Sequence, residues 1–526
     1  MSSVIEQAIN SGVFVLDGAM GTAVQTMDLT IDGDYLGREN CIDILSKTRP
    51  EIVKQIHTSF LAVGVDAVET NTFGANRLVL HEFDDEAATW AYELNVRSAK
   101  IAREACEEAG GDRFVLGSMG PGTKLVTLRQ TTWEIMLESY KEQASGLIDG
   151  GVDAFLIETC QDVLQVKCAV NACIDALLAS GKSTQDIPIM VSVTIETTNT
   201  MLIGSDLQTV VHALAPYPIL SLGLNCATGP KLMDLHVAWL CKHWQGNISV
   251  VPNAGLPELV DGAAHFPLSA QAYAASMKRF VTEYGVNIIG GCCGTTSKHL
   301  KAFVELKSDV TIAKRTPAPL VPSATSLYRP VEFKQDTSIL IVAERTNANG
   351  SRKFKRLLEE ELWDGLVGMA KEELAGGAHV LDVCVDYVGR DGIADMDELV
   401  ARLTQHVDAP IMLDSTDAKA IEAGLKRCGG RCIVNSINLE DGEKRLDDIC
   451  PLLHRFGAAC VALTIDEEGM AKTATAKIKV AHRLHDLYTK KWNLRSSDLF
   501  IDVLTFTIAT GMDADRRLAL ETLDAI

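Results

Sequence analysis

The stretch GVNIIGGCCG, residues 285–294, contains the unit from which most of this chain is built. Gly285 follows an amphipathic helical segment, and glycine suits a helix end that needs a left-handed residue. A short apolar run comes next, typical of a strand buried on both faces of a parallel sheet. The same pattern follows other glycines, at Gly64, Gly151, Gly377 and Gly457. The chain is therefore expected to be an α/β protein with parallel strands.

Counting these strands gives the expected architecture of the first part of the chain. Before residue 300 the pattern predicts eight strands, at residues 13–18, 66–71, 114–120, 154–159, 187–194, 219–226, 248–255 and 286–294. Eight strand–helix units over about 300 residues are typical of a closed (β/α)8 barrel of the TIM type. We expect this barrel to span residues 1–313.

A second series of strands follows a Pro-rich segment. Residues 314–330 hold four prolines with little periodicity, so residues 314–335 are expected to be a linker. Six more strands are predicted, at residues 338–347, 378–386, 410–416, 431–438, 460–465 and 499–505. A barrel with six of its eight strands would leave two open parallel edges, which proteins avoid. Residues 336–526 are therefore expected to be a second TIM-type barrel, truncated after about six strands, in a chain that is a fragment or is completed from elsewhere.

The composition of the chain limits the classes of partner that it is expected to bind. The 526 residues are 47% hydrophobic and 23% charged, as in ordinary globular proteins, and the net charge is −21. A nucleic-acid or anionic-membrane binder needs a basic footprint, so small molecules or other proteins are favoured as partners. No signal or membrane-spanning segment is recognised, and we expect a cytoplasmic protein whose 14 cysteines are reduced thiols or metal ligands.

The cysteines at two strand ends form the strongest chemical signal. Cys226 ends the sixth predicted strand, and Cys292 and Cys293 end the eighth between glycines. The glycines let the backbone leave the strand, so all three sulfurs can turn to one point on the rim. Three thiolates suit zinc, and the open fourth position is typical of a catalytic site that binds a substrate thiol. The alternative is a pair of buried thiols in a Gly-rich turn, or an adventitious disulfide.

A second candidate site lies at the end of the first strand. The turn Asp17-Gly18-Ala19-Met20-Gly21 opens a helix, and free N–H groups at a helix N-terminus suit a carboxylate. Asp17 and Glu158 could hold an ammonium group, so the site could bind both charged ends of an amino acid. The alternative is a tight βα turn with a capping aspartate.

Five motifs in the first barrel together resemble a known family. They are DGAMGT (17–22), ETNTFGAN (69–76), GLNCATGP (223–230), PNAGLP (252–257) and GGCCGT (290–295). In this order they resemble the homocysteine S-methyltransferase domain of the cobalamin-dependent methionine synthases, over about residues 8–310. The resemblance implies that Cys226, Cys292 and Cys293 bind a catalytic zinc ion that activates homocysteine. It also implies that Asp17 and Glu158 hold the amino group of this substrate.

The second half resembles the pterin-binding domain of the same family. The motifs are AERTNANG (343–350), LDST (413–416), NSIN (435–438) and DVLTFTIATG (502–511). A carboxylate can accept two parallel N–H bonds from a pterin edge, and an amide can both donate and accept. Alone, each polar residue could equally be a cap or turn residue. The resemblance implies that 5-methyltetrahydrofolate contacts Glu344, Asn347, Asp414, Asn435 and Asp502.

Two departures from the family pattern affect the second half. Cys384 stands in LDVCVD where the family usually has Asn, so one contact or support of the pterin pocket is in doubt. The last two strands of the family's barrel are missing. The corrinoid-binding motif DxHxxG is also missing, and the nearest string, Asp234-Leu-His236, lies in a predicted helix.

The resemblance implies the substrate-binding half of a methionine synthase. Methyl would pass from 5-methyltetrahydrofolate to cobalamin, held by a corrinoid-binding module outside this chain, and then to zinc-bound homocysteine. One alternative is a cobalamin-independent homocysteine methyltransferase that uses a betaine- or sulfonium-type donor. Another is a zinc- and folate-binding subunit that docks a separate corrinoid protein.

Overall fold

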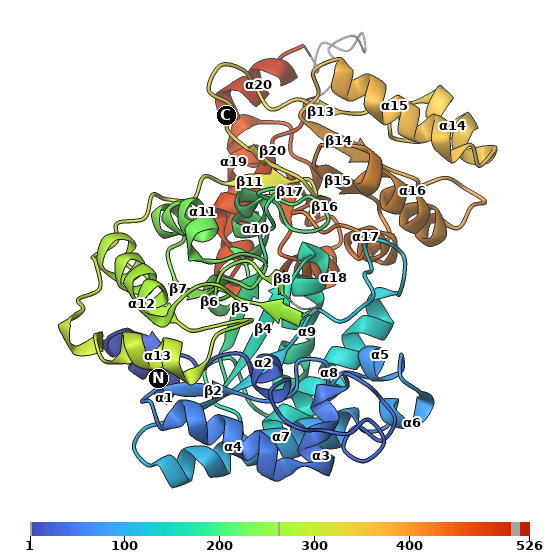
Figure 1. The fold of residues 1–526 in the computed structure, drawn as a ribbon. Coiled ribbons are helices and arrows are strands. Elements are labelled where there is room, and N and C mark those ends of the chain that lie inside the picture. Colours follow the sequence, from blue (N-terminus) through green and yellow to red (C-terminus); the bar gives the residue numbers. More distant parts are fainter. Residues whose placement is uncertain (1–2, 261–262, 506–515) are drawn as a thin grey trace. The chain divides into compact units, whose positions relative to one another are not determined.

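The computed structural model divides the chain into two compact units. The described residues are 3–260, 263–505 and 516–526. The first unit consists of Met1–Leu207 and Pro218–Leu320, and the second of Gln208–Tyr217 and Val321–Ile526. Each unit contains one large parallel sheet, drawn as arrows in Figure 1. The chain therefore carries two separate strand–helix series, and each is described below by itself.

The first unit contains a closed parallel barrel. Its strands over the described residues are β1 (Phe14–Val15), β2 (Ala67–Glu69), β3 (Phe114–Met119), β4 (Ala154–Cys160), β5 (Ile189–Val193), β6 (Ile219–Asn225), β7 (Asn247–Val251) and β10 (Ile288–Ile289). They pair in the order β1-β10-β7-β6-β5-β4-β3-β2. The two ends of this sheet meet, because the Asp66 N–H donates to the Val15 carbonyl and the Val15 N–H to the Asp66 carboxylate, both at 2.7 Å. The eight-stranded barrel predicted from the sequence is confirmed.

The second unit contains a shorter sheet of the same kind. The described strands are β13 (Val342–Ala343), β14 (Val380–Val383), β15 (Ile411–Asp414), β16 (Ile433–Ile437), β17 (Ala459–Leu463) and β20 (Leu499–Asp502). They are all parallel and pair in chain order. The prediction of a TIM-type barrel truncated after six strands is therefore confirmed.

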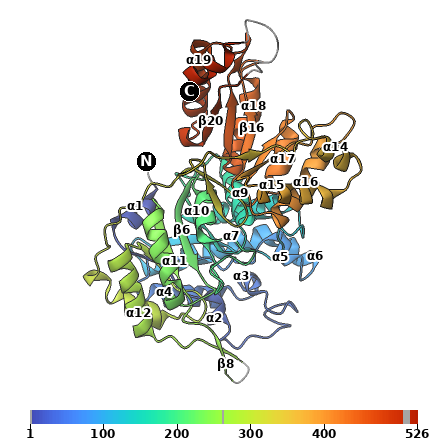
Figure 2. The same cartoon turned by 90° about the horizontal axis from the view of Figure 1, so that it is seen from above.

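Helices follow the strands and pack side by side. Before the second sheet they are α1 (Val4–Ser11), α2 (Met20–Val24), α3 (Leu45–Thr48), α4 (Pro50–Leu61), α5 (Arg77–Leu80), α6 (Asp85–Ala88), α7 (Ala91–Ala109), α8 (Trp133–Gly150), α9 (Val163–Ala179), α10 (Leu207–Leu214), α11 (Pro230–His243), α12 (Ala270–Arg279) and α13 (Ser297–Val304). Later helices are α14 (Arg352–Glu359), α15 (Trp363–Ala375), α16 (Gly392–His406), α17 (Ala418–Leu425), α18 (Lys444–Phe456), α19 (Ala474–Asp486) and α20 (Leu518–Ala525). In the first unit α7 packs against α4 and α8, and in the second α16 packs against α15 and α17 (Figures 1 and 2).

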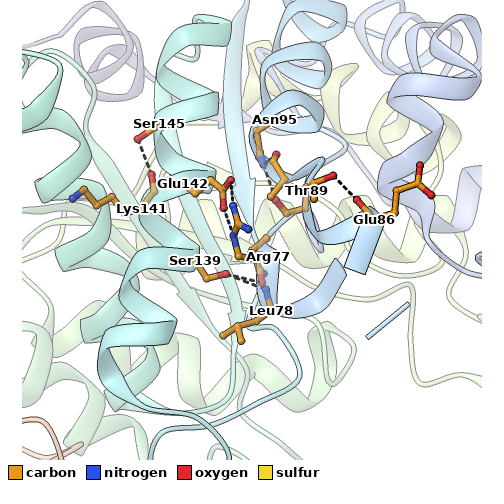
Figure 3. Close-up of polar contacts among 12 residues, drawn as sticks. Arg77, Leu78, Glu86, Thr89, Asn95, Ser139, Lys141, Glu142 and Ser145 are labelled. Atoms are coloured by element: carbon orange, nitrogen blue, oxygen red, sulfur yellow. Dashed lines mark hydrogen bonds and ion pairs between the residues drawn. The ribbon is translucent and has the colours of Figure 1, made fainter. Parts of the chain in front are cut away.

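Small and polar side chains fix the contact of α8 with its neighbours. A Cβ at Gly150 would lie 2.5 Å from the Cβ of Ala99, so α7 and α8 approach at a position that only glycine fits. On the outer surface Arg77 of α5 donates two hydrogen bonds to Glu142 of α8, at 2.8 and 2.6 Å (Figure 3). These contacts hold the outer helices in place around the barrel.

The N-terminal end of the barrel is filled by apolar side chains. Ile5 and Ile9 of α1 are buried in one cluster with Phe14, Phe114 and Ile288, which stand at or near the starts of their strands. This end is therefore closed, and the opposite rim, at the carboxyl ends of the strands, is left for a site. None of the helices in the described ranges is long and apolar enough to cross a membrane.

Three antiparallel hairpins were not anticipated. They are β8 (Glu258–Val260) with β9 (Ala263–His265), β11 (Ser323–Thr325) with β12 (Pro330–Glu332), and β18 (Ile465–Asp466) with β19 (Gly469–Met470). The second falls inside the segment expected to be a linker, 314–335. Ala324 packs in the core of the second unit with Val380 and Ile433. Burial of these few apolar residues, rather than any local periodicity, gives this part of the segment its structure.

His57 of α4 provides a test of the first unit's packing. It is fully buried, neither ring nitrogen has a hydrogen-bond partner within the described part of the chain, and burial lowers its pKa to about 4. Because the unfolded chain binds this proton near pH 6.5, stability is lost as the pH falls from about 6.5 toward 4. Between pH 7.5 and pH 5, protonation of His57 in the unfolded chain should lower the unfolding free energy by about 2 kcal/mol. We expect this part of the decrease to be absent in His57→Leu, as measured by urea titration. An unchanged pH dependence would contradict a neutral, buried imidazole.

Candidate functional site

The carboxyl ends of the first unit's strands surround a cavity of about 390 Å³. Its lining includes every residue of the first barrel that the sequence nominated, namely Asp17, Gly18, Ala19, Met20, Glu158, Cys226, Cys292 and Cys293. These residues come from the ends of four strands that are far apart in the sequence. The fold thus gathers into one cavity the two groups of residues that were predicted separately.

Three thiols converge at one side of this cavity. The sulfur of Cys293 lies 3.9 Å from that of Cys226 and 4.0 Å from that of Cys292, and all three lie within 4.8 Å of one another. Tetrahedral zinc with bonds of about 2.3 Å requires sulfurs about 3.8 Å apart. Three half-buried thiols at this spacing therefore fit a zinc ion.

Glycines and left-handed residues bring these sulfurs together. Cys226 has a φ of +56°, so the chain leaves β6 at this residue and the side chain turns from the direction it would take in a strand. A Cβ at Gly294 would lie 2.1 Å from the Phe266 ring, and one at Gly291 would lie 2.3 Å from Thr295 Oγ1. Only glycine fits the backbone on both sides of the adjacent cysteines, as the sequence pattern predicted.

The thiols share their protons unequally. Hydrogen bonds from Cys226 and Cys292 lower the pKa of Cys293 to about 3, against the opposing effect of burial. Hydrogen bonds with Cys226 and Cys293, together with burial, raise the pKa of Cys292 well above its ordinary value. One thiolate with two thiol protons beside it is a state in which a divalent cation can replace the protons, because metal binding requires deprotonated sulfur.

Carboxyl groups line the other side of the cavity. Both oxygens of Asp17 accept the backbone N–H of Glu69 at 3.2 Å, and Ser118 donates its hydroxyl to Glu158. Burial raises the pKa of Asp17, of Glu69 and of Glu158, the last to about 7. No Lys or Arg is found among the described residues that line the cavity. Three carboxyl groups without a cation favour a positively charged ligand group such as an ammonium.

Asn225, for which no role was predicted, connects the two sides of the cavity. The amide oxygen of Asn225 accepts the Thr159 N–H at 2.9 Å and the Ser192 hydroxyl at 2.7 Å, and its amide nitrogen donates to Thr159 Oγ1 at 2.7 Å. Thr159 has a φ of +58°, which is strained for a β-branched residue. Asn225 precedes Cys226 and Thr159 follows Glu158, so this brace fixes a thiol relative to a carboxyl group. A polar residue directly before the cysteine at a strand end was the signal for it.

The candidate folate residues of the second unit are only partly brought together. The amide nitrogen of Asn347 donates to Asp382 at 2.8 Å and to Asp414 at 2.9 Å. Asn435 pairs with Asp414 across β15 and β16 and also bonds Asp382, whose pKa is raised to about 6, chiefly by burial. Asp382 belongs to this cluster although the sequence did not nominate it, and one of its buried oxygens has no partner among the described residues.

Glu344 and Asp502, the other two residues nominated from the sequence, lie at the edges of this cluster. Glu344 is exposed and acts on Asp382 only through its charge. Asp502 ends β20, is exposed, and accepts the Leu504 N–H at 2.7 Å, with no contact to the cluster given by the described residues. Positions 506–511 of the motif DVLTFTIATG lie outside the described residues.

Two further side chains support the cluster. Cys384 is buried beside it, and its thiol bonds Asp414 and receives the Asn349 amide at 3.5 Å, so the thiol occupies a supporting position. Arg445 of α18 donates to the carbonyls of Ser415, Thr416 and Ser436, at 2.7, 2.8 and 3.0 Å. This guanidinium fastens the loops that follow Asp414 and Asn435, a role that no local motif indicated.

Comparisons with known proteins agree with this division. Residues 14–306 match the family Homocysteine S-methyltransferase, and residues 343–526 match the family Pterin binding enzyme. The chain is 45% identical over 524 residues to a methionine synthase of Mycobacterium tuberculosis (strain ATCC 25618 / H37Rv) and to one of Mycobacterium leprae (strain TN). These matches cover 98% of this chain but 43% of each relative, so the chain spans less than half of their length.

Solved structures resemble this chain only distantly. The metallated form of the homocysteine methyltransferase MmuM from Escherichia coli has 21% identity and a TM-score of 0.44, and covers 57% of this chain and 98% of its own. The family assignment therefore rests on the sequence match, which covers more than half of the chain. The chain belongs to the homocysteine S-methyltransferase family and carries, after that domain, a pterin-binding domain.

Proposed function

We propose that this chain is the substrate-binding half of a cobalamin-dependent methionine synthase. Its first barrel would bind homocysteine as the methyl acceptor, and its second barrel would bind 5-methyltetrahydrofolate as the donor. The observation that carries the proposal is the shared cavity, which is lined by the three thiols and by carboxyl groups that include Asp17, Glu69 and Glu158. Cobalamin would be bound by a corrinoid module outside this chain.

Cys226, Cys292 and Cys293 would hold the zinc ion. When bound, zinc supplies a Lewis acid that lowers the pKa of a substrate thiol, so that the thiolate forms near neutral pH. The glycine turn around Cys292 and Cys293 holds these sulfurs in position before the metal binds. The chain itself would thus contribute a preformed set of three sulfur ligands in the lining of the cavity.

The carboxyl groups would bind the other end of homocysteine. An ammonium beside Asp17 and Glu158 offsets the burial that raises the pKa of both, so both groups can bind it as anions. The backbone of Gly18, Ala19 and Met20 lines the same cavity, and its N–H groups suit the substrate carboxylate. The Asn225 brace keeps Glu158 at a fixed place relative to Cys226. Orientation of the thiol toward an incoming methyl group would follow from these two anchored ends.

In the second barrel the amide–carboxylate cluster would bind the pterin ring. Asp414 can accept paired N–H groups of a pterin edge, and Asn435 can donate and accept beside it. Asn347 holds Asp414 and Asp382 in place through its two amide hydrogens. Glu344 and Asp502 would complete the pocket from the neighbouring loops.

Replacing one thiol tests the zinc and homocysteine assignment. A serine hydroxyl does not ionise at neutral pH, so Cys292→Ser should reduce bound zinc from about one equivalent per chain to a small fraction. Methionine formation from homocysteine and added methylcobalamin should fall about 100-fold or more, while binding of 5-methyltetrahydrofolate stays unchanged. Metal analysis, product chromatography and folate titration measure the three quantities.

Cys241→Ala, at a buried cysteine of α11, is the matched control and should keep its zinc. Undiminished zinc in Cys292→Ser would contradict the assignment. Methionine formed by the unmodified chain from a betaine or sulfonium donor, without any corrinoid, would instead support the cobalamin-independent reaction.

Removing one charge in the second barrel tests the folate assignment. Asp414→Asn replaces a carboxylate that accepts charged hydrogen bonds, so the Kd for 5-methyltetrahydrofolate should rise about 10- to 100-fold. Zinc content and homocysteine binding should not change. Asp441→Asn, an exposed residue after β16, is the control, and equal folate affinity in both variants would show that Asp414 is not a ligand.

A further inference from the structure

Glu69, at the end of β2, lines the first unit's cavity, and its side chain has no hydrogen-bond partner among the described residues. Its backbone N–H binds Asp17, but its own carboxylate accepts no hydrogen bond from the described residues. Burial raises its pKa, and the charges of Glu158 and Asp17 raise it further. A half-buried carboxyl group that is repelled by two others is unfavourable unless a ligand offsets the repulsion.

The neighbouring carboxyl groups are already engaged. Both oxygens of Asp17 share the Glu69 N–H, and one oxygen of Glu158 accepts the Ser118 hydroxyl. Asp43, a fourth carboxyl group in the lining, accepts the Gly74 N–H at 2.9 Å and takes no part in the repulsion among the other three. Glu69 thus has the largest unused hydrogen-bonding capacity on this side of the cavity.

The number and placement of these groups match one ligand group. An ammonium carries three N–H donors, and Asp17, Glu69 and Glu158 offer one carboxyl group each from β1, β2 and β4. The thiols follow β6 and β10, on the part of the barrel rim that adjoins β1 through the pairing of β1 with β10. A ligand with an ammonium at one end and a thiol at the other fits this arrangement.

We propose that Glu69 is a third ligand of the substrate ammonium, and that it makes the site select α-amino thiols over thiols without an amino group. This rests on the proposed function, because it takes homocysteine as the occupant of the cavity. Glu69 is a specificity-determining residue in this account, and it does not touch the sulfur.

The test compares two thiols that differ only in the amino group. L-Homocysteine and 4-mercaptobutanoate are titrated calorimetrically into the zinc-loaded full chain and into its Glu69→Gln variant. Loss of a charged hydrogen bond should raise the Kd for homocysteine about tenfold or more in Glu69→Gln, and that for 4-mercaptobutanoate less than about twofold. Glu69→Asp keeps the charge, and its Kd for homocysteine should lie between that of the unmodified chain and that of Glu69→Gln. Glu107→Gln, an exposed position on α7, removes a charge outside the cavity and should behave as the unmodified chain.

Zinc content is measured in every variant, so that a loss of the metal is separated from a loss of ammonium binding. Equal weakening of both thiols in Glu69→Gln, or no weakening of either, would overturn the role of Glu69 alone. Failure of the zinc-loaded, unmodified chain to bind either thiol would overturn the proposed function itself.

Discussion

The approach of three sulfur atoms to within 4.8 Å is the constraint on which the rest of the first unit depends. Thiols at this distance compete for protons, and the competition is relieved when a cation takes the place of the protons. Bringing them together requires strands that end at the same rim and a backbone that turns sharply after them. The parallel barrel provides the first condition, and the glycines around Cys292 and Cys293 provide the second.

Two kinds of acidic group, carboxyl groups and thiols, lie on different parts of this rim. Carboxyl groups from β1, β2 and β4 stand on one side, and sulfurs from β6 and β10 stand on the other. Neither side has a Lys or Arg within the described lining. Asn225 connects the sides through two hydrogen bonds with Thr159, which offset the strain at that residue, and a third hydrogen bond from Ser192 holds Asn225 itself. Rigid separation of this kind favours a ligand with one charged group for each side.

Much of this could be predicted from sequence because the relevant signals are local. Apolar runs after glycines predicted the parallel strands of both barrels, and the shared rim predicted that Cys226 would meet Cys292 and Cys293. Hydrogen bonds between residues far apart in the sequence leave no local pattern, which is why the Asn225 brace and the Arg445 contacts were missed. The hairpin at Ala324 was missed for a related reason, since its burial depends on strands about 60 or more residues later. Asp382 went unnoticed because its neighbours Asn347 and Asn435 come from other strands.

The most direct test is zinc-edge X-ray absorption spectroscopy of the zinc-loaded chain, recorded before and after addition of homocysteine. The zinc assignment predicts three sulfur neighbours at about 2.3 Å without substrate and four after homocysteine is added. Fewer than three sulfurs in the first spectrum, or no additional sulfur in the second, would contradict it.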